Sequence, residues 1–337
     1  MNITILITGG AGFIGSNFVR YMLLHTEYSI VVVDALTYAG NPENLADFIA
    51  DKRLSFIQER IEHTEKIREI CNHYGVEGII NFAAETHVDR SIMDPSPFVT
   101  SNVMGTVSLL NIARELGLRY VQISTDEVYG SLGDDGYFTE HTPLQPSSPY
   151  SASKASADMF VQSFVHTFGV NASITRCSNN YGPYQFPEKL IPLMIVRALE
   201  NTTLPVYGDG KNVRDWIHVD DHNSAVWAVY CQGKKGEVYN IGASSEQHNI
   251  DIVKKILSSL GKSEHLITYV KDRPGHDRRY AIDSTKIMTE LGWRPQISFA
   301  DGLESTIEWY CTHQQWCNNI RNGDYQRYYQ QLYGKNI

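Results

Sequence analysis

The sequence is poor in cysteine, and its cysteines are not spaced for a disulfide framework or a metal site. Five cysteines are scattered over 337 residues, and none forms a Cys-x-x-Cys pair. Small disulfide-rich domains and structural zinc sites depend on closely spaced cysteines, so this spacing argues against both classes. We therefore expect reduced thiols, no bound metal and a cytoplasmic protein.

Long hydrophobic runs and an excess of positive charge are also missing. No stretch approaches the roughly 20 apolar residues of a membrane-spanning helix, and the first apolar run stops at Gly9, too early for a signal peptide. Asp and Glu (38) outnumber Lys and Arg (29), which gives a net charge of −9. An acidic chain binds nucleic acid poorly, although a local basic pocket is not excluded. We expect a globular protein that binds neither membranes nor nucleic acid.

What the sequence does contain is a glycine-rich turn close to its start. The apolar run Ile3–Ile7 predicts a buried strand, and helical periodicity follows the turn. Gly9, Gly12 and Gly15 permit a tight turn and close approach of a pyrophosphate to the backbone. Asp34, 19 positions after Gly15, ends a second predicted strand, where a carboxylate accepts from ribose hydroxyls and repels a 2′-phosphate. The pattern predicts NAD binding.

A hydroxyl residue and two acids follow a predicted central strand. The strand is Tyr120–Ile123, and Thr125, Asp126 and Glu127 come at its carboxyl end. Catalytic groups gather at such strand ends in open α/β sheets. Adjacent carboxylates in a closed pocket can take different protonation states, as an acid and a base require. The alternative is a pair of solvated loop acids, which this position disfavours.

Tyr150 and Lys154 lie one helical turn apart and share a face. An ammonium near a phenol stabilises the phenolate and lowers a pKa that is roughly 10 in water. The pair therefore predicts a base that works near neutral pH. A Tyr-x-x-x-Lys spacing alone is usually a surface pair, and the dinucleotide motif in the same chain is what favours the catalytic interpretation.

The fold class that these patterns predict is α/β, a Rossmann-type doubly wound parallel sheet with a smaller mixed α/β domain toward the C-terminus. The NAD-binding domain is expected at residues 1–176 plus about 213–243. The substrate domain is expected at about 177–212 plus 244–337, because the chain becomes rich in turns, aromatics and amides after Cys177.

Three further segments suggest contacts. Ala83 and Ala84 end a predicted strand and are small enough for a cofactor to lie against the backbone. The basic cluster 273–279 predicts, with Arg214, a clamp for a diphosphate, the alternative being a solvated turn. Helices are expected at 98–116 and 150–168, and if they flank the sheet we expect their outer faces to form a two-fold homodimer interface, the alternative being solvated surface helices.

In this order, the glycine motif, the hydroxyl at a strand end and Tyr-x-x-x-Lys resemble the extended short-chain dehydrogenase/reductases that act on nucleotide sugars. Within them the chain closely resembles the dTDP-glucose 4,6-dehydratase family, over nearly its whole length. The matching stretches are 34–41, 84–91, 124–130, 150–154, 178–190, 211–216 and 273–283. The acid pair Asp126-Glu127 is the most specific match, because the sister epimerases lack it.

The resemblance implies a hydro-lyase with tightly bound NAD that oxidises C4 of dTDP-glucose, removes water across C5 and C6 and returns hydride to C6. The implied catalytic residues are Thr125, Asp126, Glu127, Tyr150 and Lys154. The implied NAD-binding residues are Gly9, Gly12, Phe13, Ile14, Gly15, Asp34, Leu36, Thr37, Arg60, Ile61, Ala83, Ala84, Ser101, Tyr150, Lys154 and Asn180. The implied nucleotide-sugar residues are Thr86, Thr125, Asn179, Lys189, Leu190, Tyr207, Arg214, Asn249, Arg273 and His276.

One position departs from the family pattern. Arg60-Ile61 stands where the family usually has Asp-Ile. Since arginine has no hydrogen-bond acceptor, the adenine contact must change, with stacking the expected substitute.

Three other functions stay open. They are a 4,6-dehydratase of a UDP- or CDP-linked sugar, a nucleotide-sugar 4-epimerase, and a catalytically silent dinucleotide-binding regulator. The acid pair argues against the epimerase, and the intact Thr125, Tyr150 and Lys154 argue against the regulator.

Overall fold

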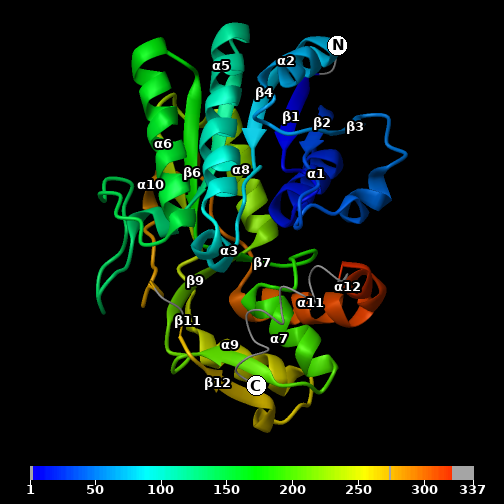
Figure 1. Ribbon diagram of the computed structural model, residues 1–337, viewed down its shortest axis with the longest axis vertical. Helices are drawn as coiled ribbons and strands as arrows, with labels where there is room; N and C mark the ends of the chain where they lie inside the picture. The colour runs from blue at the N-terminus through cyan, green and yellow to red at the C-terminus, as the bar shows by residue number, and fades with distance from the viewer. Residues whose placement is uncertain (1–2, 273–274, 321–337) are drawn as a thin grey trace.

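Seven parallel strands form the large sheet of the protein. The computed structural model describes residues 3–272 and 275–320 (Figure 1). The strand order is β10-β6-β5-β4-β1-β2-β3, and the order reverses between β1 and β4, which places a crevice outside their carboxyl ends. The strands are β1 (Thr4–Thr8), β2 (Ser29–Asp34), β3 (Leu54–Gln58), β4 (Val76–Asn81), β5 (Arg119–Thr125), β6 (Ala172–Cys177) and β10 (Val238–Ile241).

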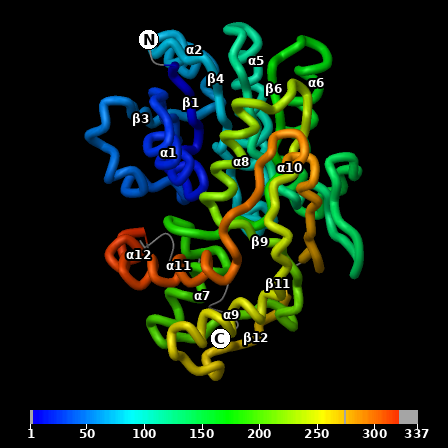
Figure 2. Tube along the Cα trace, turned by 180° about the vertical axis from the view of Figure 1, so that it is seen from behind, coloured from blue at the N-terminus to red at the C-terminus, as the bar shows by residue number. Residues whose placement is uncertain are grey.

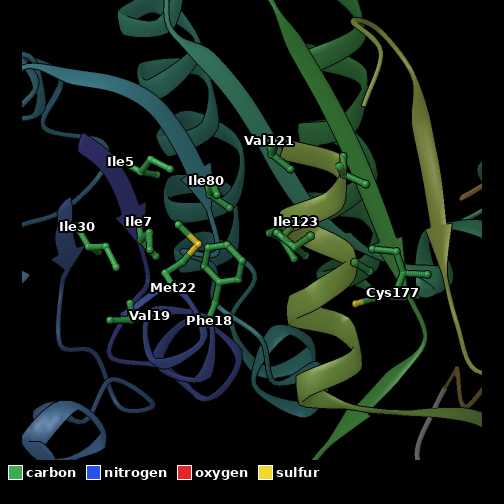
Figure 3. Packing of buried hydrophobic residues seen from close by; sticks show 14 of the residues in the cluster. Ile5, Ile7, Phe18, Val19, Met22, Ile30, Ile80, Val121, Ile123 and Cys177 are labelled. Carbon is green, nitrogen blue, oxygen red and sulfur yellow. The ribbon is translucent and has the colours of Figure 1, made fainter. Parts of the chain in front are cut away.

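Helices cover both faces of this sheet, as Figures 1 and 2 show from opposite sides. On one face lie α1 (Phe13–His25), α8 (Val219–Gln232) and α10 (Thr285–Leu291); on the other lie α2 (Thr64–Tyr74), α5 (Thr106–Leu116) and α6 (Pro149–Phe168). Because both faces are covered, all five residues of β1 are buried. Figure 3 shows Phe18 and Met22 of α1 packed beside Ile7 and Ile80. The predicted Rossmann-type sheet is confirmed.

Short helices fill the connections at the carboxyl edge of the sheet. They are η1 (Pro42–Phe48), α3 (Val88–Met93), α4 (Ser96–Phe98), η2 (Val99–Gly105) and η3 (Asp126–Tyr129). The helix expected at 98–116 begins with the π-helical turn η2 and continues as α5, and the helix expected at 150–168 is α6.

A smaller mixed α/β lobe lies beyond the carboxyl ends of the large sheet (Figure 1). It has a three-stranded sheet in the order β11-β9-β7, with β7 (Asn179–Tyr181), β9 (Val213–His218) and β11 (Glu246–His248), and a pair of parallel strands, β8 (Leu204–Tyr207) and β12 (Ile267–Val270). Its helices are α7 (Leu190–Leu199), α9 (Asn249–Ser259), η4 (Glu264–Leu266), α11 (Phe299–Thr312) and α12 (Gln314–Ile320). Apolar residues of α7, α9 and α11 form its separate core. The predicted smaller α/β part is therefore present, while the residue boundaries between the two domains stay a prediction.

In the two described ranges, no helix combines the length and the apolar character that crossing a membrane requires.

A buried ion pair attaches α6 to the large sheet. Nε of Arg176, on β6, lies 2.8 Å from Oδ2 of Asp158, on α6, and the two side chains are 5% and 1% exposed. The guanidinium also donates to the Tyr129 hydroxyl at 3.0 Å. Since α6 carries Tyr150 and Lys154, this pair helps to fix the position of both side chains.

Replacing Asp158 with alanine should lower the free energy of unfolding by about 3–5 kcal/mol, because it leaves the charge of Arg176 buried without its partner. Urea denaturation measures the loss. Glu69→Ala is the control, since Glu69 and Lys66 form a pair with side chains 72% and 65% exposed, and exposed pairs contribute at most about 1 kcal/mol. Equal losses in the two variants would contradict a stabilising role for the buried pair.

Candidate active site

The turn between β1 and α1 leaves no room for side chains at two of its glycines. Gly9 has φ of +68°, and a Cβ atom there would lie 2.6 Å from the backbone nitrogen of Ala83, at the end of β4. A Cβ atom at Gly15 would overlap the carbonyl oxygen of Gly9. The backbone is therefore bare where the crevice begins, and α1 starts there with Gly12 as its N-cap. This cradle fits the pyrophosphate of a dinucleotide.

Asp34 ends β2 beside the cradle. Its Oδ2 accepts from the backbone N–H of Ala11 at 2.9 Å, and its Oδ1 accepts from that of Leu36 at 2.8 Å. Burial raises the pKa of Asp34, and the two backbone donors offset part of this rise. The donors also hold the carboxyl group in one orientation, with lone pairs left for ribose hydroxyls. The site therefore fits NAD, as predicted.

A cavity of about 270 Å³ at the carboxyl ends of the strands brings most of the predicted site residues together. Those predicted for the cofactor that line it are Gly9, Gly12, Phe13, Ile14, Gly15, Asp34, Thr37, Arg60, Ile61, Ala83, Ala84, Ser101, Tyr150, Lys154 and Asn180. Those predicted for catalysis or the nucleotide sugar that line it are Thr86, Thr125, Asp126, Glu127, Asn179 and Lys189. Their roles stay predictions, but their assembly into one cavity is what those roles require.

Among the described residues, six predicted binding residues do not line this cavity: Leu36, Leu190, Tyr207, Arg214, Asn249 and His276. Arg273 lies outside the described residues. The predicted diphosphate clamp stays a prediction; of its described arginines, Arg278 bonds Asp209 at 2.9 Å and Arg279 bonds Glu246 at 2.6 Å. Arg214 stacks on the ring of Tyr280 and donates to backbone carbonyls.

Thr125 organises the two acids that follow it. It is the last residue of β5 and the N-cap of η3, where its Oγ1 accepts from the N–H of Glu127 at 3.3 Å. The same hydroxyl lies 3.3 Å from Oδ1 of Asp126, to which it donates. The strand end and its capped turn therefore present a hydroxyl and two carboxyl groups in a fixed order.

The surroundings of Asp126 favour its protonated form. Burial raises its pKa well above the usual value, and the nearby carboxylates of Glu127 and Asp215 raise it further, against a smaller opposing effect of Arg214. Its Oδ2 is buried, and no residue in the described ranges hydrogen-bonds it. A protonated acid with one unused oxygen in the cavity wall can donate to a ligand.

The predicted lowering of the pKa of Tyr150 is wrong for this structure. Burial raises that pKa well above its usual value, Glu127 adds to the rise, and a hydrogen bond with Thr125 offsets only part of it. The ammonium of Lys154 donates to the carbonyl oxygen of Ile123 at 2.6 Å, and burial lowers the Lys154 pKa. Without a ligand, Tyr150 therefore keeps its proton.

Two acids of the cavity wall, Glu85 and Glu188, were not among the predicted site residues. Burial raises the pKa of both, that of Glu188 to about 7. Each adjoins a residue predicted to bind substrate, Thr86 and Lys189 respectively, and this adjacency was the available signal. Cys177, which ends β6 and also lines the cavity, was identified only as the point where the composition changes.

Arg60, the residue that departs from the family pattern, lies at the cavity wall. Its Nε donates to Oε1 of Glu62 at 2.6 Å. This bond orients the guanidinium plane, and a planar group of this kind can stack on an adenine ring.

Comparisons with known proteins agree with this geometry. Residues 6–306 match a protein family described as GDP-mannose 4,6 dehydratase. A dTDP-glucose 4,6-dehydratase of Salmonella typhimurium is 47% identical over 98% of each chain. The low-salt glycan biosynthesis protein Agl12 of Haloferax volcanii is 52% identical over 91% of this chain and 98% of its own.

The same relationship appears among solved structures. A dTDP-glucose 4,6-dehydratase from Streptomyces venezuelae, solved with NAD bound, superposes with a TM-score of 0.92 at 48% identity, and the match covers 94% of this chain and all of that one. Sequence, fold and the assembled cavity therefore agree that this chain belongs to the nucleotide-sugar 4,6-dehydratase family, together with the dTDP-glucose 4,6-dehydratases.

Proposed function

We propose that this protein is a dTDP-glucose 4,6-dehydratase that carries its own NAD and releases dTDP-4-keto-6-deoxy-glucose. The observation that carries the proposal is the cluster of Thr125, Asp126, Glu127 and Tyr150 in one cavity with the dinucleotide cradle. Oxidation alone needs only the tyrosine and the threonine, whereas removal of water needs an acid and a base as well. Both are present at the end of β5.

The cofactor would be held by the cradle at Gly9 and Gly15, by Asp34 at the ribose and by Lys154. Bound NAD supplies a hydride acceptor that is restored within each turnover. The cofactor therefore has no need to leave between turnovers, and we expect the purified protein to retain it.

Oxidation at C4 is the step that makes dehydration possible. The C5 proton of glucose is not acidic, but beside a C4 ketone the resulting carbanion is delocalised as an enolate. Tyr150 Oη would take the proton of the C4 hydroxyl, and Thr125 Oγ1 would hydrogen-bond the C4 oxygen. Because burial raises the pKa of Tyr150, the phenol must first lose its own proton to solvent before it can accept that of the C4 hydroxyl. The positive charges of Lys154 and of bound NAD would favour this phenolate.

The two acids then act in opposite directions. Glu127 would remove the C5 proton, while Asp126, already protonated, would donate to the departing C6 hydroxyl. Glu127 would afterwards return a proton to C5. The protonation state that burial imposes on Asp126 is the one that this step needs.

The nucleotide part of the substrate would extend toward the smaller lobe. Lys189 is the N-cap residue of α7, and its ammonium donates to the carbonyl oxygen of Thr86 at 3.2 Å, so it already bridges the two lobes.

We also propose that residues 1–176 plus about 213–243 form the NAD-binding domain and that the remainder binds the nucleotide sugar. We propose a cytoplasmic location as well, where sugar nucleotides are available.

We further propose a homodimer formed by α5 and α6. Met159, Phe160 and Phe168 of α6 are exposed, and so is Met104 of the adjoining turn η2. Large apolar side chains gathered on neighbouring helices mark association surfaces, and a two-fold arrangement would pair the same two helices from each subunit.

Met159→Glu should therefore halve the molar mass measured by light scattering, because it places charge at the centre of the proposed interface. Ile49→Glu, which changes an exposed apolar residue elsewhere, should leave the mass unchanged. A wild-type protein that scatters as a monomer at micromolar concentration would refute the dimer.

Incubation of the purified protein with dTDP-glucose, without added NAD, should give a sugar nucleotide that has lost one water, as measured by mass spectrometry. Glu127→Gln should lower the rate of water loss by about 10²–10⁴-fold, the usual contribution of a general base, while NADH absorbance still rises on mixing. Glu69→Gln, an exposed substitution on α2, is the control.

Full dehydration by Glu127→Gln would refute the role of Glu127. Unchanged mass with a new C4 epimer would instead favour the epimerase. A substrate untouched by the wild type, with NAD bound, would favour the regulator or a different nucleotide sugar, and UDP- and CDP-glucose would separate these two.

Asp126→Asn should make the protein more stable than the wild type at neutral pH. The unfolded carboxyl group has a pKa of roughly 3.9, and burial raises the folded pKa above it. Between the two values the folded state keeps a proton that the unfolded state releases, so wild-type stability falls as pH rises through this window. Thermal midpoints from pH 4 to pH 8 should diverge between the two proteins, and parallel curves would contradict the protonated form.

A further inference from the structure

We infer that Glu188 is a further substrate-binding residue, whose buried carboxyl group hydrogen-bonds a hydroxyl of the sugar ring. The inference rests on the proposed function and adds a sugar contact to it. Glu188 lies in the turn between β7 and α7, in the smaller lobe, and lines the same cavity as the catalytic cluster.

The side chain of Glu188 is enclosed, although the turn itself is partly exposed. Only 3% of the side chain is accessible to solvent. The ammonium of the next residue, Lys189, donates to the carbonyl oxygen of Thr86. The ring of Phe186 packs edge-on against that of Tyr38, with 5.9 Å between the ring centroids. The turn is therefore fixed against the large lobe on both sides of Glu188, and its carboxyl group is held toward the cavity.

Neither oxygen of this carboxyl group has a hydrogen bond of normal geometry within the described chain. Its Oε2 lies 3.8 Å from Nε2 of His87, which is too long for a hydrogen bond. The Tyr38 hydroxyl makes at most a hydrogen bond of poor geometry with this carboxyl group, which lowers the pKa of Glu188, and the same hydroxyl lies 3.4 Å from Oγ1 of Thr86. Buried carboxyl oxygens without partners are costly and rare in proteins, so Glu188 is expected to have a partner in the complex.

The charges around Glu188 indicate which part of the substrate this partner is. A carboxyl group repels a diphosphate, whereas a sugar hydroxyl can both donate to it and accept from it. Burial raises the pKa of Glu188 to about 7, and Asp89 adds to the rise against Lys189 and Arg90. The group therefore exists as acid and as carboxylate near neutral pH, and both forms bind a hydroxyl. Thr86 and Asn179, predicted substrate residues, line the same cavity.

The test compares Glu188→Leu with Glu188→Gln, since the amide keeps a donor and an acceptor and leucine keeps only the volume. The expected results are a KM for dTDP-glucose raised about 10- to 100-fold in the leucine variant, the usual effect of losing a bond to an ionisable group, and less than about threefold in the glutamine variant. Inhibition by dTDP, which has no sugar, should stay within about twofold of wild type in both. Glu200→Gln, at the exposed end of α7, is the control.

Deoxy analogues of the substrate locate the contact. Among dTDP-2-deoxyglucose and dTDP-3-deoxyglucose, the one lacking the contacted hydroxyl should bind wild type more weakly, and Glu188→Leu should weaken its binding no further. Equal weakening of dTDP and dTDP-glucose would show a structural role and overturn the inference, as would unchanged affinities in both variants. The dissociation constants of dTDP, dTDP-glucose and the deoxy analogues can be measured without turnover, so they remain decisive for Glu188 even if wild type removes no water, which alone would refute the proposed function.

Discussion

Removal of the catalytic groups from water is the constraint on which the rest of the site depends. Asp126 and Lys154 are buried and Tyr150 is partly buried. This removal from water shifts each pKa in the direction that favours the neutral form of the group. In water, two of these groups would be charged at pH 7. Here burial between the strands and helices favours protonated Asp126. The proposed proton donation from Asp126 therefore needs no additional group to protonate it.

Such burial is tolerated only because the scaffold supplies compensating contacts. Lys154 donates to the carbonyl at the end of β5, and Asp34 accepts from two backbone N–H groups. The Arg176–Asp158 pair ties α6 to β6 below the catalytic residues of that helix. Each of these buried charges thus has a partner from a rigid element. Of the carboxyl groups with a buried oxygen that has no hydrogen-bond partner in the described ranges, Asp126 and Glu188 line the cavity.

The sequence was most informative where a function requires a particular backbone. Glycine at positions 9 and 15 is enforced by contacts below van der Waals distance, and an acid at the end of β2 follows from the same dinucleotide chemistry, so both were predictable from spacing. The doubly wound parallel sheet followed from alternating apolar runs and helical periods. These features are local, or they follow from general rules of chain topology.

What failed or was missed depends on residues that meet only in three dimensions. The pKa of Tyr150 is set by burial and by Glu127, 23 positions earlier, rather than by the lysine one turn away. Arg278 and Arg279 form ion pairs with Asp209 and Glu246, which no spacing rule connects to them. The position of Glu188 in the wall requires knowing that the turn before α7 folds back onto Thr86.

The environments of two adjacent acids distinguish dehydration from simpler oxidation on this scaffold. A tyrosine, a threonine and a dinucleotide suffice to oxidise and reduce C4, and a fold alone does not fix which reaction follows. Asp126 is 1% exposed and Glu127 is only half-buried, because the 3₁₀ turn that Thr125 caps directs consecutive side chains into different surroundings. Burial favours the protonated form of the first and leaves the second nearer to solvent, as their proposed roles of general acid and general base require. If the turn were straightened into a longer strand, the two side chains would point to opposite faces of the sheet, and the pair could no longer act on neighbouring carbons of one sugar.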